Sequence, residues 1–155
     1  MLAEMLKKEN IKILDEIEDW ETAIRISLQP LEEGGYVEKR YADEIIKSTK
    51  EIGSYYVLTE DIALIHGRPE QGVLKKQLAV TIVRKPVIFI GSEFPVRVLL
   101  ALAAVDSNSH IDVMRVLSSI FLDEAKIKRV AEADSPEQVY EFLLKEEQEG
   151  GDFYC

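Results

Sequence analysis

The sequence predicts an α/β fold in which a β-sheet lies between helices. Between residues 55 and 105 the chain consists of short apolar runs rich in β-branched and aromatic residues, whereas helical periodicity dominates on both sides. Several of these runs are apolar on both faces, which is typical of strands that helices cover from both sides. The length of 155 residues is that of one ordinary domain, which can bury a core without disulfides or metal.

Two amphipathic helices are predicted before the β-rich segment. The first follows Asp19, a residue type that caps helix N-termini, and is expected to end near residues 34–35. The second spans about residues 38–51 and is closed by Gly53. The spacing of the isoleucines over residues 11–17 predicts a strand ahead of both helices.

The middle of the chain predicts a series of strands. They cover residues 55–58, 62–65, 78–83, 87–90 and 96–105. Pro86 and Pro95 are expected between these strands, because a missing amide donor does least harm there.

Helices are predicted again after the strands. Apolar spacing over residues 111–121 indicates a largely buried helix, and a short helix is expected after Asp123. The last helix is expected to begin at Ser135, an N-cap residue, with Pro136 at the first helical position. A glutamine then stands where a capping box requires one, at position 138.

We expect a single domain over residues 1–155, with its core at about residues 10–147 and an acidic tail over residues 148–155. The only cysteine, Cys155, ends this tail. The sequence therefore predicts neither a disulfide framework nor a paired-thiol redox motif.

Charge and hydropathy exclude several classes of function. The 19 Lys and Arg residues against 29 Asp and Glu give a net charge of -10 without a basic block, so we expect no binding to nucleic acid or anionic lipid. Such a surface suits a basic protein partner. The longest apolar stretch, residues 96–105, is far shorter than the ~20 residues of a membrane helix, and residues 1–9 lack the apolar part of a signal peptide. We expect a soluble cytoplasmic protein that does not insert into membranes.

The two histidines of the chain are the candidates for chemistry. His66 follows one predicted strand, within the stretch 65–69, and His110 follows another, at the end of the run 104–110. If the fold brings these strand ends together, it forms a site with two imidazoles. An imidazole in such a place can act as a general base, a metal ligand or a nucleophile.

The missing motifs narrow this choice. His66, His110 and Asp106 offer too few ligands for a metal site, and the chain lacks His-x-x-x-His and Cys-x-x-Cys spacing. It also lacks Gly-x-Ser-x-Gly and both glycine-rich nucleotide motifs, so we expect no cofactor. What remains is histidine as a covalent phosphoryl carrier, because a neutral imidazole with an ordinary pKa of about 6.5 is nucleophilic near pH 7.

A phosphoryl group on His66 would need hydrogen-bond donors and positive charge around its oxygens. Candidates are the Arg68 guanidinium, the amide of Gly67, the second imidazole at His110, and Ser109 with the two polar residues before it, just ahead of the predicted helix. Simpler roles stay open for the same residues. A histidine at a strand end is more often a hydrogen-bonded structural residue, Arg68 can be a solvated surface charge, and His110 can cap the helix that follows it.

Four segments together resemble a known family. They are residues 53–58, 62–73, 102–110 with the predicted helix 111–121 that follows, and 135–139. The stretch His-Gly-Arg-Pro-Glu-x-Gly-Val starting at His66 is the most specific of them. In these segments the chain resembles the type-2 enzyme IIA (EIIA) domains of phosphoenolpyruvate-dependent sugar phosphotransferase systems (PTS), the mannitol/fructose class, and most closely their ascorbate-type branch. The resemblance extends over about residues 19–144.

The resemblance implies a three-layer α/β/α sandwich around a mixed parallel/antiparallel sheet of about five strands. It also implies a phosphotransferase component in which His66, through Nε2, accepts a phosphoryl group from the carrier protein HPr and passes it to a cognate enzyme IIB. His110 would hydrogen-bond the phosphoryl group and hold its geometry. The sugar, for which the branch suggests ascorbate, would be bound by the membrane component of the system.

Two positions depart from the family pattern. Ile65 stands where the family has proline directly before the active histidine, so we expect slower or looser transfer. Lys50 stands where mannitol-type members have an arginine, and an ammonium does not reproduce bidentate recognition. Ile65 also motivates an alternative, a regulatory or interaction module that has the enzyme IIA fold and reduced or absent transfer. A third alternative is a structural homologue without phosphorylation.

Overall fold

The computed structural model describes residues 2–151, of which residues 107, 109, 110, 112, 150 and 151 are described by their backbone alone. Cys155 and the end of the predicted acidic tail lie outside this range. Among the described residues, no helix is both long and apolar enough to cross a bilayer.

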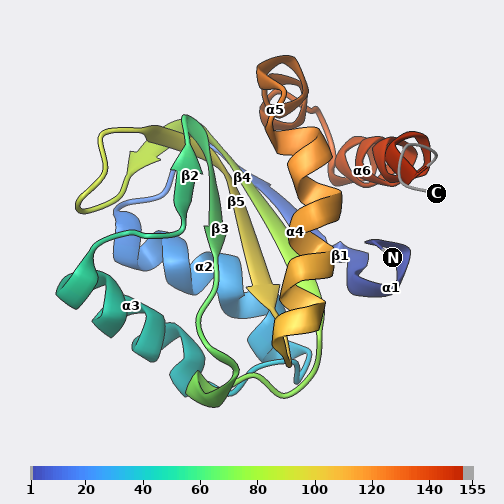
Figure 1. Ribbon diagram of the computed structural model, residues 1–155. Helices are drawn as coiled ribbons and strands as arrows, with labels where there is room; N and C mark the ends of the chain where they lie inside the picture. Colours follow the sequence, from blue (N-terminus) through green and yellow to red (C-terminus); the bar gives the residue numbers. More distant parts are fainter. Residues whose placement is uncertain (1, 152–155) are drawn as a thin grey trace.

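A mixed sheet of five strands forms the centre of the described chain (Figure 1). Its strands are β1 (Leu6–Leu14), β2 (Val57–Thr59), β3 (Asp61–Ile65), β4 (Gln77–Ile88) and β5 (Pro95–Ala103). Their order across the sheet is β1-β4-β5-β3-β2. The pairs β1–β4 and β3–β5 are parallel, whereas β4–β5 and β2–β3 are antiparallel.

Helices cover both faces of this sheet. The helices are α1 (Leu2–Met5), α2 (Trp20–Glu33), α3 (Arg40–Ile52), α4 (Ser107–Phe121), α5 (Glu124–Ala131) and α6 (Pro136–Gly151), and a short 3-10 turn, η1, covers Pro69–Gln71. Helices α2 and α3 lie on one face, and α4, α5 and α6 lie on the other with the short α1 (Figure 1). The predicted α/β/α sandwich is confirmed.

The alternation of side chains along β3 shows how the two faces are filled. Ile62 and Leu64 belong to the core under α4–α6, whereas Ala63 and Ile65 belong to the core under α2 and α3. All four side chains are buried. A strand that is apolar on both faces needs helices on both, which is what the sequence pattern predicted.

Capping explains where several helices begin and end. Asp19 accepts a hydrogen bond from the amide of Thr22 at 2.8 Å, as predicted for the N-cap of α2. Gly53 closes α3 at a φ of 86°, a conformation that side chains rarely adopt. At the start of α6, Ser135 accepts from the amide of Gln138, whose side chain accepts from the amide of Asp134, one residue before the predicted capping box.

Two strand predictions on the β1–β4 side were wrong in their extent. β1 covers Leu6–Leu14 instead of residues 11–17. Its first half was missed because the pairing with β4 is irregular between Leu6 and Ile11, and the polar residues there interrupt the alternation that marks a strand. Residues 78–83 and 87–90 were predicted as separate strands, but β4 runs through Pro86. The register shifts between Ile82 and Val87, and such an irregularity accommodates a proline.

Three further boundaries differ from the prediction. Pro95 is the first residue of β5, which ends at Ala103 and not at residue 105. Tyr55 and Tyr56 form a turn before β2, so the predicted strand 55–58 is reduced and shifted. Helix α4 begins at Ser107 and not at residue 111, so the polar segment that was expected to precede the helix forms its first turn. α1 and η1 were not predicted, and α6 extends into the predicted tail as far as Gly151.

Candidate functional site

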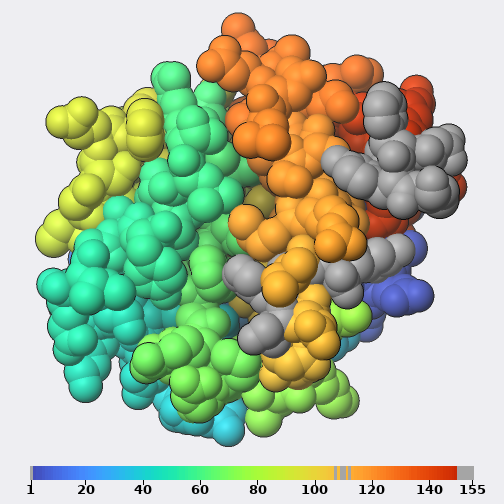
Figure 2. All heavy atoms as spheres, in the orientation of Figure 1, coloured from blue at the N-terminus to red at the C-terminus, as the bar shows by residue number. Residues whose placement is uncertain are grey.

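A cavity lies at the end of the sheet where β3 and β5 both terminate. Because these strands are parallel, their carboxyl ends meet there. The cavity has a volume of about 740 Å³ and is open to the surface. It is lined by Ser48, Glu51, Ile52, Tyr55, His66, Gly67, Arg68, Pro69, Gln71, Ala104, Asp106 and Ile111. These residues come from α3 and the turn that follows it, from the loop after β3 with η1, and from the junction of β5 with α4, which share one face of the molecule (Figure 2).

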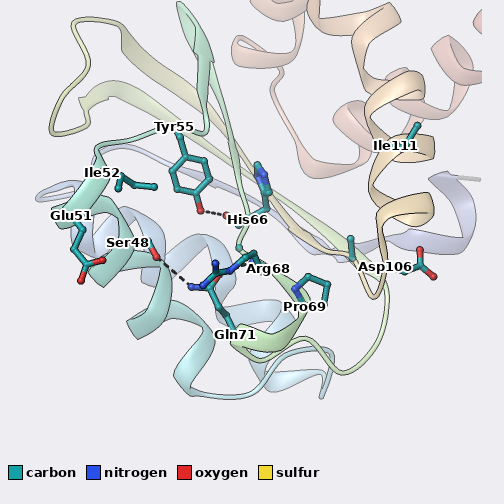
Figure 3. A pocket seen from close by; sticks show the side chains of 12 residues that line it. Ser48, Glu51, Ile52, Tyr55, His66, Arg68, Pro69, Gln71, Asp106 and Ile111 are labelled. Carbon is teal, nitrogen blue, oxygen red and sulfur yellow. Dashed lines mark hydrogen bonds between the residues drawn. The ribbon is translucent and has the colours of Figure 1, made fainter.

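The fold therefore brings the two predicted strand ends to one cavity. His66 is the first residue after β3 and lines this cavity (Figure 3). His110 belongs to the first turns of α4, whose residue Ile111 also lines it. The side chains of His110 and Ser109 lie outside the described part of the structure, so their predicted contacts with a phosphoryl group stay predictions.

A backbone carbonyl fixes the protonation pattern of the His66 ring. Nδ1 of His66 lies 2.6 Å from the carbonyl oxygen of Leu64. Because a carbonyl oxygen only accepts hydrogen bonds, Nδ1 carries the proton in the neutral ring, and Nε2 is the nitrogen that holds the lone pair. The Tyr55 ring meets the imidazole edge to face, with ring centres 5.6 Å apart.

Two tyrosine hydroxyls hold the backbone on either side of the peptide bond that follows His66. The Tyr55 hydroxyl donates to the carbonyl oxygen of His66 at 2.6 Å (Figure 3). The Tyr41 hydroxyl accepts from the amide of Gly67 at 2.7 Å and donates to the carbonyl oxygen of Leu102 at 3.0 Å. This corrects the expectation for Gly67, because the amide that was predicted to face a phosphoryl group points to Tyr41 instead.

Gln71 fixes the next part of the loop from its buried position. Its side-chain oxygen accepts from the amide of Arg68 at 2.7 Å, and its side-chain nitrogen donates to Ser48 Oγ at 3.3 Å (Figure 3). A Cβ atom on Gly67 would lie 2.6 Å from the same Gln71 oxygen. Any side chain at position 67 would have to displace the Gln71 oxygen, and glycine lets the backbone pass close to Gln71 without this.

Of the two basic residues considered in the sequence, Arg68 lies at the rim of the cavity and Lys50 does not. Arg68 lines the cavity and its guanidinium lies 3.3 Å from Glu70, with both side chains more than two thirds exposed. Lys50, which the resemblance set against an arginine of mannitol-type members, is not among the residues that line the cavity. Its ammonium pairs with Glu21 of α2 at 3.0 Å. The positions of α3 that face the cavity are Ser48, Glu51 and Ile52.

Burial moves the pKa of the Tyr41 hydroxyl further above neutral pH. It raises the pKa of Tyr41 to about 12, although the hydrogen bond from Gly67 opposes the shift. Burial also raises the pKa of the Tyr55 hydroxyl, and the positive charge of Arg68 opposes this. At neutral pH both hydroxyls are thus protonated and can donate as well as accept.

Sequence reasoning missed the residues that hold the loop, namely Tyr41, Tyr55 and Gln71. Tyr41 stood in the sequence as part of the apolar stripe of a helix, and Gln71 stood at the unspecified position x of the family motif. One signal was present, because a buried tyrosine almost always finds a partner for its hydroxyl. What the sequence does not contain is the identity of that partner, 26 residues away.

Comparison with known proteins identifies the family of this chain. Residues 4–146 match the family described as phosphoenolpyruvate-dependent sugar phosphotransferase system, EIIA 2. The ascorbate-specific PTS EIIA component of Shigella boydii is 31% identical over 142 residues, which are 90% of this chain and 92% of that protein.

Two solved structures from Escherichia coli share the fold. The mannitol-specific cryptic phosphotransferase enzyme IIA superposes with a TM-score of 0.86 at 30% identity, covering 92% of this chain and 97% of that one. Enzyme IIA(Mtl), solved in complex with phosphorylated enzyme IIB(Mtl), superposes with a TM-score of 0.79 at 31% identity, covering 90% and 97%. The chain belongs to the EIIA 2 family of phosphoenolpyruvate-dependent sugar phosphotransferase systems.

Proposed function

We propose that this protein is a cytoplasmic phosphocarrier that accepts a phosphoryl group from phospho-HPr on Nε2 of His66 and passes it to a cognate enzyme IIB. The observation that carries the proposal is the hydrogen bond between Nδ1 of His66 and the carbonyl of Leu64, which assigns the lone pair to Nε2 in a residue that lines the cavity. Family membership supports the same chemistry.

The transfer step balances without a cofactor. The Nε2 lone pair attacks phosphorus, the bond from phosphorus to the donor's leaving atom breaks, and its electron pair stays with the donor. The ring then gains positive character, which the hydrogen bond from Nδ1 to the Leu64 carbonyl stabilises. Onward transfer reverses these changes, because the acceptor atom in enzyme IIB attacks phosphorus and the Nε2 pair returns to the neutral ring.

We propose Arg68, His110 and Ser109 as the groups around the phosphoryl oxygens. Arg68 lines the same cavity as His66, and its guanidinium brings charge that suits the oxygens of a phosphoryl group. For His110 and Ser109 the support is the position of their backbone in the first turns of α4, since the neighbouring Ile111 lines the cavity. The enzyme IIB partner is supported by the relative that was solved together with its own phosphorylated enzyme IIB.

Intact mass spectrometry tests the acceptor. The protein is incubated with phosphoenolpyruvate, enzyme I and HPr, and one added, acid-labile phosphoryl group is expected. His66→Ala should abolish this addition, whereas His110→Ala should keep it and slow the onward step to enzyme IIB. Absence of the addition, or its survival in His66→Ala, would contradict the proposal. A protein that accepts the group and does not pass it on would be the regulatory module.

For the sugar class we propose an ascorbate-type system, as the sequence resemblance suggests and as an ascorbate-specific relative supports. The solved mannitol-type relatives have similar identity and make mannitol the competing assignment. Transfer from the phosphorylated protein to purified enzyme IIB of each type separates the two. A clear preference for a mannitol-type enzyme IIB would reject the ascorbate assignment.

A further inference from the structure

We propose that Tyr41 is a positioning residue for phosphoryl transfer, because its hydroxyl sets the place of the His66 loop relative to the end of β5. This inference rests on the proposed function of His66. Tyr41 itself lies on α3, where its side chain is fully buried and is not among the residues that line the cavity.

The Tyr41 hydroxyl joins two segments that build opposite parts of the site. It accepts from the amide of Gly67, the residue directly after His66, at 2.7 Å. It donates to the carbonyl of Leu102, near the end of β5, at 3.0 Å. Two residues beyond Leu102, Ala104 begins the part of the cavity wall that leads into α4. One hydroxyl thus relates the nucleophile to the helix that carries His110.

The chemistry of the hydroxyl makes this bridge specific. A neutral hydroxyl has one proton, and the carbonyl of Leu102 lies closer to it than the carbonyl of Gly67, at 3.0 Å against 3.4 Å. Donation to Leu102 leaves the oxygen lone pairs to receive the amide of Gly67. Removal of the hydroxyl leaves a buried donor and acceptor without their partner and allows the loop to shift.

A shift of this loop would act on the rate of transfer more than on binding of the donor protein. In-line transfer requires Nε2 of His66 to approach phosphorus from a narrow range of directions, and a displacement of about 1 Å can lower a rate by about 100-fold. Binding of the donor protein depends on a wider surface. We therefore expect Tyr41→Phe to lower the maximal rate of His66 phosphorylation by about 10-fold to 100-fold.

Tyr56 provides a matched control within the same core. Its side chain is also fully buried, and its pKa is also raised to about 12 by burial. Its hydroxyl, however, bonds to Thr49 Oγ1 at 2.9 Å instead of to the loop. Tyr56→Phe should therefore disturb a buried hydrogen bond to a similar extent and leave the position of His66 unchanged.

The experiment measures single-turnover phosphorylation by phospho-HPr at increasing donor concentrations, at a temperature where both variants are folded by circular dichroism. Tyr41→Phe should lower the maximal rate and keep the half-saturating concentration, whereas Tyr56→Phe should stay within about twofold of the wild type. Equal rates for the two variants, or an effect of Tyr41→Phe on the half-saturating concentration alone, would overturn the proposal.

Hydrogen exchange at the Gly67 amide provides a readout that does not depend on transfer. Tyr41→Phe should accelerate this exchange much more than Tyr56→Phe does, and equal acceleration would reject the positioning role. If the wild-type protein takes up no phosphoryl group, the proposed function fails. The positioning of the loop is then judged by the exchange of Gly67 alone.

Discussion

The two helical layers contribute to the site in different ways. From the α2–α3 layer, polar side chains reach into the loop after β3, where Tyr41, Ser48 and Arg40 contact the Gly67 amide, the Gln71 side chain and the Glu70 carbonyl. The opposite layer supplies a wall to the cavity through the start of α4, where Ile111 is half exposed. Among the described residues, hydrogen bonds from α3 hold the loop, whereas the start of α4 contributes to the wall of the cavity. Substitutions in the two layers should therefore separate site geometry from overall stability.

The largest effect on stability is expected from truncating a buried apolar side chain in the core on either side of the sheet. Ile45 lies under the loop and Leu143 lies in the opposite layer, and both side chains are fully buried. Ile45→Ala and Leu143→Ala should each lower the free energy of unfolding by about 2–5 kcal/mol in urea titrations. Only Ile45→Ala should also slow phosphorylation, because its Cγ1 lies 3.2 Å from the place of a Cβ on residue 67. Equal slowing in both variants would remove the distinction between the layers.

A smaller loss of stability is expected when a methyl group is added to the loop at residue 67. In Gly67→Ala the new Cβ would lie 2.6 Å from the Gln71 oxygen and must displace it from the amide of Arg68. We expect a loss of about 1–3 kcal/mol in thermal or urea unfolding, together with slower phosphorylation.

The double variant Gly67→Ala, Gln71→Ala serves as the control for this prediction. Because the clash involves the Gln71 side chain, the double variant should lose less stability than the sum of the two single variants. Strict additivity would show that the methyl group is accommodated without moving Gln71.

Alkaline pH should lower the free energy of unfolding through two buried tyrosines, Tyr41 and Tyr56, in the core under α2 and α3. Burial raises the pKa of Tyr41 and Tyr56 from 10.0 to about 12. Between these values the unfolded chain releases the tyrosine protons while the folded protein retains them, so the free energy of unfolding falls as the pH rises from 10 to 12. Below pH 10 the contribution is complete, and each tyrosine should account for about 2 kcal/mol of the loss.

Urea titrations at several pH values check this expectation, with the two phenylalanine variants as controls. Tyr41→Phe and Tyr56→Phe should each flatten the decline between pH 10 and pH 12 relative to the wild type. A decline of unchanged slope in both variants would show that other groups cause the alkaline loss.

The smallest effect on stability is expected at the rim. Arg68 and Glu70 form an exposed pair, so Arg68→Ala should change the free energy of unfolding by less than about 1 kcal/mol. If Arg68 contacts the phosphoryl group, the same variant should slow phosphorylation clearly, and Glu70→Ala should not. Rapid-quench measurement of both variants decides this, and an unaffected rate in Arg68→Ala would remove Arg68 from the phosphoryl contacts.

The element pattern was largely predictable because it depends on local periodicity. Asp19 and Gly53 mark helix ends by capping and turn chemistry that acts within a few residues. The continuity of β4 through Pro86 was not predictable, because it depends on the register with β5. The start of α4 at Ser107 was also missed, because the residues of its first turn are polar and show no apolar periodicity.

By itself, the sequence determined that a sheet lies between two helical layers and that His66 follows a strand with a glycine behind it. The three-layer mixed topology and the family came from the resemblance of its segments, which the structure and the comparisons confirmed. Only the tertiary structure decided which groups hold the site, because these contacts join distant residues. Tyr41 lies 26 residues from Gly67 and 61 from Leu102, and Ser48 lies 23 residues from Gln71. Periodicity reports which side chains are buried, whereas the partner of a buried hydroxyl is settled when the chain has folded.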